Sequence, residues 1–149
     1  MFSAVSVEEL GWQKRSDGMS IELEAGIIGR DVERLCEFYT QVMGFALVER
    51  FEHAAGTVCK LRRGAARIKI FRSVEPVEPA VASHPWFQAG GWRYAALYVE
   101  NLADVDALTR AVADNGGRVL IAPTSHRDGA RMALVCDPEE NVWELLAES

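Results

Sequence analysis

The sequence predicts an α+β fold made of two modules, each a strand followed by a helix and three more strands. Residues 31–45 place Val, Leu, Phe and Tyr side chains at helical spacing, and Gly44 follows where a left-handed residue ends a helix. Residues 137–145 combine an Asp-Pro turn with an alternating strand. The third observation is that the order of elements repeats along the chain.

The first module is expected at residues 21–72. Aliphatic residues at 21–28 partly alternate and predict a strand, after which Asp31 caps the helix. Gly-containing turns then separate three further strands, which we expect at residues 45–51, 57–62 and 67–72.

The second module is expected at residues 93–147. The connection at residues 73–91 contains three prolines, which oppose regular structure. The order of elements in the first module then recurs. A strand is expected at residues 93–99, a helix ended by two glycines at residues 102–115, and three strands at residues 118–121, 131–136 and 141–146. Residues 21–149 thus form a single domain, preceded by an N-terminal extension at residues 1–20.

Composition excludes several classes of protein. A net charge of -6 and a pI near 5.1 oppose the broad cationic surface that binds nucleic acid or anionic lipid. The first residues have no apolar core of a signal peptide, and no segment has the length and apolarity of a membrane span. We expect a cytoplasmic protein, in which the three widely spaced cysteines are buried, reduced thiols.

The residues Phe38-Tyr39, Gly44-Phe45 and the segment 137–145, in this order and spacing, resemble the vicinal oxygen chelate superfamily. That group includes glyoxalase I, extradiol dioxygenases, fosfomycin resistance proteins and bleomycin resistance proteins. The resemblance covers roughly residues 21–147. It implies two βαβββ modules that form a half-open, barrel-like cup with the helices outside, and a homodimer in which modules pair across subunits.

The turn before the last strand departs from the family pattern. Many relatives have glycine where this chain has Glu140. Because a side chain disfavours the left-handed conformation, Glu140 predicts a turn of another type.

The resemblance also indicates where a metal would bind. Metal-dependent members place ligands on the first and last strands of each module, which correspond here to Glu24, Lys69, Tyr94 and Glu144. The two carboxylates are able to bind a divalent cation, whereas a charged ammonium has no lone pair and a neutral phenol is a poor ligand. We therefore expect a metal-free cup, with a two-carboxylate cation site as the minority alternative.

Two interpretations of these residues stay open. In the first, Glu24 or Glu144 acts as a catalytic base while Lys69 stabilises an oxyanion. In the second, Lys69 replaces the metal between two carboxylates, and the three residues form a buried charge network that only orders the cup. Tyr94 either donates a hydrogen bond to a ligand or has its hydroxyl satisfied within the barrel.

Alternation along the strands extends the predicted lining of the cup. It adds Arg67 and Phe71 beside Lys69, and Tyr98 beside Tyr94. Trp86, in the connection between the modules, is expected either as part of a lid over an aromatic ligand or as a linker or dimer contact.

Two functions follow. The first is a binding or resistance-type protein whose cup holds a small aromatic or anionic organic molecule without a metal. The alternative is a metal-dependent lyase, isomerase or dioxygenase that uses Glu24 and Glu144. Because one fold hosts both kinds of protein, the fold does not choose between them.

Overall fold

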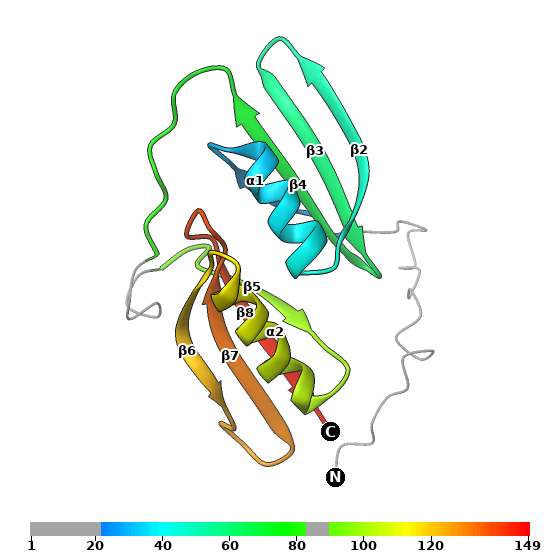
Figure 1. The fold of residues 1–149 in the computed structure, drawn as a ribbon, viewed down its shortest axis with the longest axis vertical. Helices are drawn as coiled ribbons and strands as arrows, with labels where there is room; N and C mark the ends of the chain where they lie inside the picture. The colour runs from blue at the N-terminus through cyan, green and yellow to red at the C-terminus, as the bar shows by residue number, and fades with distance from the viewer. Residues whose placement is uncertain (1–21, 83–89) are drawn as a thin grey trace.

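The structure is a computed structural model that describes residues 22–82 and 90–149. Both modules are present in it, and each contains a helix and four strands (Figure 1). The first module consists of β1 (Ala25–Ile28), α1 (Val32–Glu37), the π-helical turn η1 (Phe38–Val42), β2 (Ala46–His53), β3 (Gly56–Arg63) and β4 (Ala66–Ser73). The second consists of β5 (Ala95–Tyr98), α2 (Leu102–Asp114), β6 (Arg118–Thr124), β7 (Ala130–Cys136) and β8 (Val142–Glu148).

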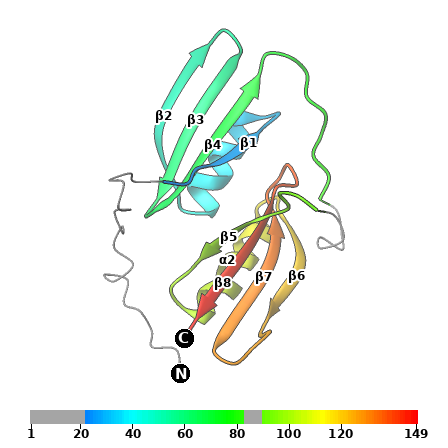
Figure 2. The same ribbon diagram turned by 180° about the vertical axis from the view of Figure 1, so that it is seen from behind.

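Each module forms one four-stranded mixed sheet, with strand orders β1-β4-β3-β2 and β5-β8-β7-β6. The first strand of each module pairs in parallel with the last, and the remaining pairs are antiparallel. Both helices cover the same side of the molecule, in front of the sheets in Figure 1 and behind them in Figure 2. This arrangement confirms the predicted α+β fold, in which the helix-free faces of two modules form an open cup and not a closed barrel.

The first helix begins at the residue that the sequence indicates. Asp31 has an extended backbone, and its carboxylate accepts a hydrogen bond from the Arg34 N–H at 3.0 Å. The helix then widens, because the N–H of Met43 bonds to the carbonyl five residues earlier and closes a π-helical turn. Gly44 ends it with φ of 73°, as predicted.

One prediction about the second module is wrong. Glu140 has φ of 69°, so the turn before β8 keeps a left-handed residue although that residue carries a side chain. Such a conformation costs roughly 1–2 kcal/mol. In this conformation the Glu140 carboxylate pairs with the Arg118 guanidinium at 2.5 Å.

A single hydrophobic core lies between the helices and the sheets. Both modules contribute side chains that are 0% exposed, namely Leu35, Tyr39, Ile70, Val105 and Leu145. Because helices of both modules bury their apolar faces in the same core, the two modules form one packed unit.

The lengths of two strands in the second module differ from the prediction. β5 is shorter than predicted, and β6 is longer. The N-terminal extension at residues 1–20 and the loop residue Trp86 lie outside the described residues. No helix within residues 22–82 and 90–149 is long and apolar enough to cross a membrane.

Candidate ligand-binding site

Alternation along β4 sorts its side chains onto two faces. Ile68 and Ile70 are buried beneath the helices, at 1% and 0% exposure. Arg67, Lys69 and Phe71 lie on the opposite, helix-free face, where they are half-buried or exposed. The predicted lining residues of the first module therefore share one face.

Lys69 and Glu24 form an ion pair on that face. The Lys69 Nζ lies 3.5 Å from Glu24 Oε1, and the two side chains are 47% and 24% exposed. Beside them, Arg67 forms a second ion pair with Glu22. The first module thus brings together two of the four residues at the predicted metal positions.

The second module carries the other two positions. Glu144 lies in β8, opposite Ala96 of β5 and Leu134 of β7. Leu134 is fully buried, so the half-buried Glu144 side chain has apolar neighbours. Tyr98 ends β5 and is 70% exposed, whereas Tyr94 directly precedes the strand and is 40% exposed.

The two half-sites are not joined by an ion pair within one chain. Among the described residues, Lys69 pairs with Glu24 and not with Glu144. The two residues lie in separate sheets that share no strand pair. The predicted network places Lys69 between two carboxylates. Within a single chain, only its contact with Glu24 is formed.

The described residues of a single chain bring no cluster of metal donors together at the predicted positions. Residues 22–82 and 90–149 contain no group of three or more His, Cys, Asp or Glu side chains that could hold a metal ion. The carboxylate of Glu24 already has an ammonium as its neighbour, and an ammonium both lacks a lone pair and repels a cation.

Four further residues lie on the helix-free face of the first sheet, and the sequence analysis does not predict them as lining residues. They are Glu49, Phe51 and His53 of β2, and Lys60 of β3. Lys60 is the strand partner of Lys69, and its Nζ lies 3.6 Å from Glu49 Oε2 and 5.8 Å from the centroid of the Phe51 ring. Alternation from Glu49 to His53 is the available signal, but the predicted strand ends at residue 51, whereas β2 continues to His53.

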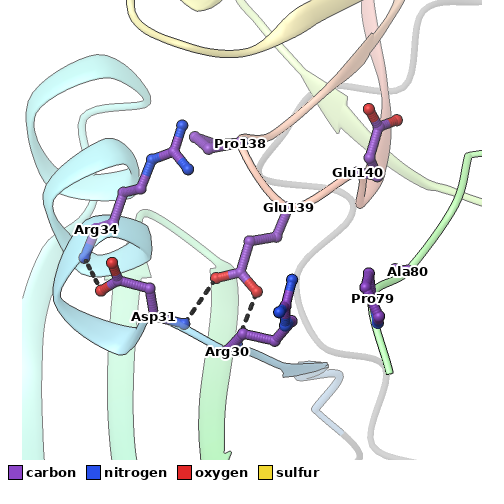
Figure 3. Close-up of a pocket in the computed structure, with 8 residues that line it drawn as sticks. All are labelled: Arg30, Asp31, Arg34, Pro79, Ala80, Pro138, Glu139 and Glu140. Carbon is purple, nitrogen blue, oxygen red and sulfur yellow. Dashed lines mark hydrogen bonds between the residues drawn. The ribbon is translucent and has the colours of Figure 1, made fainter. Parts of the chain in front are cut away.

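A pocket of about 390 Å³ lies where the start of α1 meets the Asp-Pro turn of the second module (Figure 3). In Figure 3 the Glu139 carboxylate points at the start of α1, where it accepts hydrogen bonds from the N–H groups of Arg30 at 2.7 Å and Asp31 at 3.0 Å. These groups are engaged in joining the two modules. We therefore assign this pocket to the module junction and not to a ligand.

A buried polar network completes the junction. The Tyr39 hydroxyl donates to Asp137 Oδ2 at 2.5 Å and accepts from Trp143 Nε1 at 2.8 Å. Burial raises the pKa of Asp137 above its usual range, against the lowering effect of its hydrogen bonds. Burial also raises the pKa of Tyr39, so its hydroxyl stays protonated and remains a donor.

A larger groove, of about 750 Å³, separates the end of η1 from α2. It is lined by both modules, including Phe45, Arg63 and Leu108, and by the predicted residue Tyr98. The Arg63 guanidinium donates to the Met43 carbonyl at 2.6 Å, which fixes one wall. Tyr98 therefore borders both the helix-free face and this groove.

Two of the cysteines are unsuited to act as nucleophiles. All three are free, and Cys59 and Cys136 are buried as expected, while Cys36 is half-buried. Burial raises the pKa of Cys36 to about 12 and that of Cys136 to about 12. Since the thiolate is the reactive form, neither of these thiols is suited to nucleophilic catalysis.

Comparison with known proteins gives one family. The model of the Glyoxalase/Bleomycin resistance protein/Dioxygenase superfamily matches residues 23–145. No curated protein matches the sequence significantly.

Solved structures share the fold at low sequence identity. A glyoxylase/bleomycin resistance protein/dioxygenase domain from Frankia sp. EAN1pec has a TM-score of 0.71 at 16% identity, over 88% of this chain and 93% of its own. A glyoxalase family protein from Bacillus cereus has a TM-score of 0.70 at 14% identity, over 90% of this chain and 98% of its own. TioX from Micromonospora sp. ML1 has a TM-score of 0.59 at 23% identity, over 87% and 100%.

Proposed function

We propose that this chain, which belongs to the Glyoxalase/Bleomycin resistance protein/Dioxygenase superfamily, is a binding protein whose cup takes a small aromatic or anionic organic molecule without a metal. The observation that supports this proposal is the ion pair between Lys69 and Glu24. At the positions where metal-dependent relatives are expected to hold a cation, this chain has a fixed positive charge of its own.

The magnitude of the repulsion supports a metal-free cup. Two unit charges about 4 Å apart interact by about 4 kcal/mol at an effective dielectric constant of about 20, and a divalent cation doubles that figure. A cation at Glu24 would therefore have to displace the Lys69 ammonium from its 3.5 Å contact or tolerate its repulsion. An anionic ligand, in contrast, is attracted by the same ammonium.

We propose further that a second copy of the chain completes the cup. β1 and β5 are sheet edges, each paired with one strand only. Exposed apolar side chains lie on or beside these edges, with Ile28 at 58%, Tyr98 at 70% and Trp92 at 95% exposure. Edges and apolar patches of this kind mark association surfaces. A dimer would bring the Glu144 half-site of one copy against the Lys69 half-site of the other.

The alternative function is a metal-dependent lyase, isomerase or dioxygenase. The observation in its favour is that Glu144 has an apolar setting on the helix-free face and forms no ion pair within the described residues. If a dimer brought Glu144 close to Glu24 of the partner subunit, two carboxylates would face each other. Such a pair suits a cation that keeps several waters.

Thermal shift measurements with a library of small organic molecules, with and without divalent cations, distinguish the two functions. A ligand that binds only the native state raises the melting temperature by mass action. The binding function predicts ligands whose shift does not depend on cations and weakens in Lys69→Ala. Arg72→Ala is the matched control, because Arg72 is an exposed cation of the same strand on the other face. Shifts that require a cation would favour the enzyme.

A further inference from the structure

We propose that the first module's half of the cup recognises an aryl-bearing monoanion, with the aromatic group against Phe51, His53 and Phe71 and the anionic group between Lys60 and Lys69. This inference rests on the proposed function, because it names the class of ligand that the same cup takes. The inference is based on the helix-free face of the first sheet. There, the side chains of residues paired across neighbouring strands form two rows, one aromatic and one charged.

The first row is apolar and aromatic. Phe51 of β2 pairs with Val58 of β3, and Val58 pairs with Phe71 of β4. Ile28 of β1 continues the row beside Phe71. Phe51, at 38% exposure, is exposed enough to meet a ligand. This row can bury the flat face of an aromatic group.

His53 joins the two phenylalanines of this row into a wall. Its ring is stacked on Phe71 with centroids 5.6 Å apart and planes 11° apart, and its centroid lies 6.3 Å from that of Phe51. The Ala55 N–H donates to His53 Nδ1 at 3.1 Å. Because Nδ1 accepts that bond, the neutral imidazole carries its proton on Nε2, where it can donate to a ligand.

The second row is cationic at its centre. Lys60 and Lys69 are direct partners across β3 and β4, although like charges in opposite positions destabilise a sheet. Each has one carboxylate beside it, Glu49 at 3.6 Å and Glu24 at 3.5 Å. Both distances exceed those of charged hydrogen bonds, roughly 2.7–2.9 Å. Each ammonium therefore keeps donors for an anion placed between the two lysines.

The space next to this row is open. The residue that pairs with Lys69 on β1 is Gly26, and a Cβ added there would meet no atom within 4 Å. The β1 backbone therefore leaves room beside Lys69, next to the Glu24 carboxylate that pairs with it.

The two rows set the length of the ligand. Neighbouring rows on one face are two residues apart along a strand, or roughly 6.6–6.8 Å. An aromatic carboxylate with a two-carbon spacer fits this separation better than benzoate, in which the carboxylate is attached to the ring. trans-Cinnamate is thus a suitable probe, because its spacer is rigid and planar.

Isothermal titration calorimetry of the full chain with four probes tests the inference. trans-Cinnamate has both groups, trans-cinnamamide lacks the charge, sorbate lacks the aromatic ring, and benzoate lacks the spacer. We expect cinnamate to bind roughly tenfold more tightly than cinnamamide, the size of one charge-assisted hydrogen bond. Cinnamate should also bind more tightly than sorbate, which lacks the ring contact, and than benzoate, whose carboxylate does not reach the lysine row. We expect Lys60→Met and Lys69→Met each to weaken cinnamate roughly tenfold while the affinity for cinnamamide stays unchanged.

The aromatic row has its own variants. His53→Leu and Phe51→Leu should weaken cinnamate and leave sorbate unchanged. Arg72→Met is the control on the other face, and Lys69→Arg should restore most of the affinity lost in Lys69→Met. Because the four-probe comparison uses the unaltered protein, it stays decisive even if a variant fails to fold.

The outcomes separate the two proposals. Equal affinity for cinnamate and cinnamamide, or full affinity in both folded Lys→Met variants, would overturn the aryl-anion inference. If the cup then bound other organic ligands without a cation, the proposed binding function would stand. If no organic molecule bound, or binding required a divalent cation, the proposed function itself would fail.

Discussion

The Tyr39 hydroxyl donates a 2.5 Å hydrogen bond to Asp137, and these two residues come from different modules. Trp143 donates to the same hydroxyl from β8, at 2.8 Å. The bond therefore joins the helix of the first module to the Asp-Pro turn and last strand of the second. It fixes how the two halves of the cup sit on one another.

Tyr39→Phe tests this junction. The change removes one donor and one acceptor, and leaves Asp137 and the Trp143 N–H with one partner fewer inside the core. An unsatisfied buried polar group costs about 1–3 kcal/mol. We expect urea denaturation to show a loss of stability in this range. Tyr98→Phe is the control, because Tyr98 is 70% exposed, and an equal loss in both variants would contradict the role of the junction.

The same junction should affect the pH dependence of stability. Burial raises the pKa of Asp137 above 3.8, so the folded state holds this proton more tightly than the unfolded state. The contribution of Asp137 to stability is fully present below the unfolded pKa and is lost as pH rises through the folded pKa.

Urea denaturation of wild type and Asp137→Asn, from about pH 3 to about pH 7, isolates this contribution. We expect the stability of wild type relative to the variant to fall as pH rises above 3.8, the ordinary Asp pKa. A relative stability that rises with pH would show that hydrogen bonding to the carboxylate outweighs its burial.

The end of the first helix supports a third prediction. Gly44 has φ of 73°, and a Cβ added there would lie 2.7 Å from Arg63 Nη1. Gly64 has φ of 57° with open space around it. Gly44→Ala should destabilise the protein by about 1 kcal/mol for the backbone conformation, plus the cost of displacing Arg63. Gly64→Ala should cost only the backbone share; equal losses in thermal denaturation would contradict the Arg63 contact.

A fourth prediction concerns Glu139, which holds the start of α1 from the other module. Its carboxylate accepts two backbone hydrogen bonds, from Arg30 and Asp31. Glu139→Ala should lower stability by about 1–2 kcal/mol, the scale of a lost helix cap. Glu148→Ala is the control, because the exposed Glu148 side chain forms a surface ion pair with Arg127, an interaction of little energetic weight. If hydrogen exchange at the first turn of α1 were unchanged in Glu139→Ala, this role would be excluded.

The sequence predicted the features that depend on interactions between residues close together in the chain. The Asp31 cap and the left-handed Gly44 depend on the chain within a few residues, and both are confirmed. Glu140 shows the limit, because its residue type disfavours the left-handed backbone that it adopts, and its ion-pair partner Arg118 lies outside the turn. The π-helical turn η1 had no signal in the periodicity of apolar residues.

The candidate site was predictable along single strands but not across them. Alternation along β4 predicts that Lys69 and Phe71 share one face, and the structure confirms this. The contribution of Lys60 depends on the register of β3 against β4, which sets it opposite Lys69. The Tyr39–Asp137 bond depends on how the modules pack, and no pattern within either segment encodes that packing.

The most direct test of the metal-free cup is a paired measurement on untagged protein prepared without a nickel column. Metal content is determined by mass spectrometry, and the affinity for an organic ligand found by thermal shift is then measured with and without EDTA. We expect no stoichiometric metal and an affinity that EDTA leaves unchanged. Stoichiometric zinc, iron, manganese or nickel, or binding abolished by EDTA, would contradict this expectation.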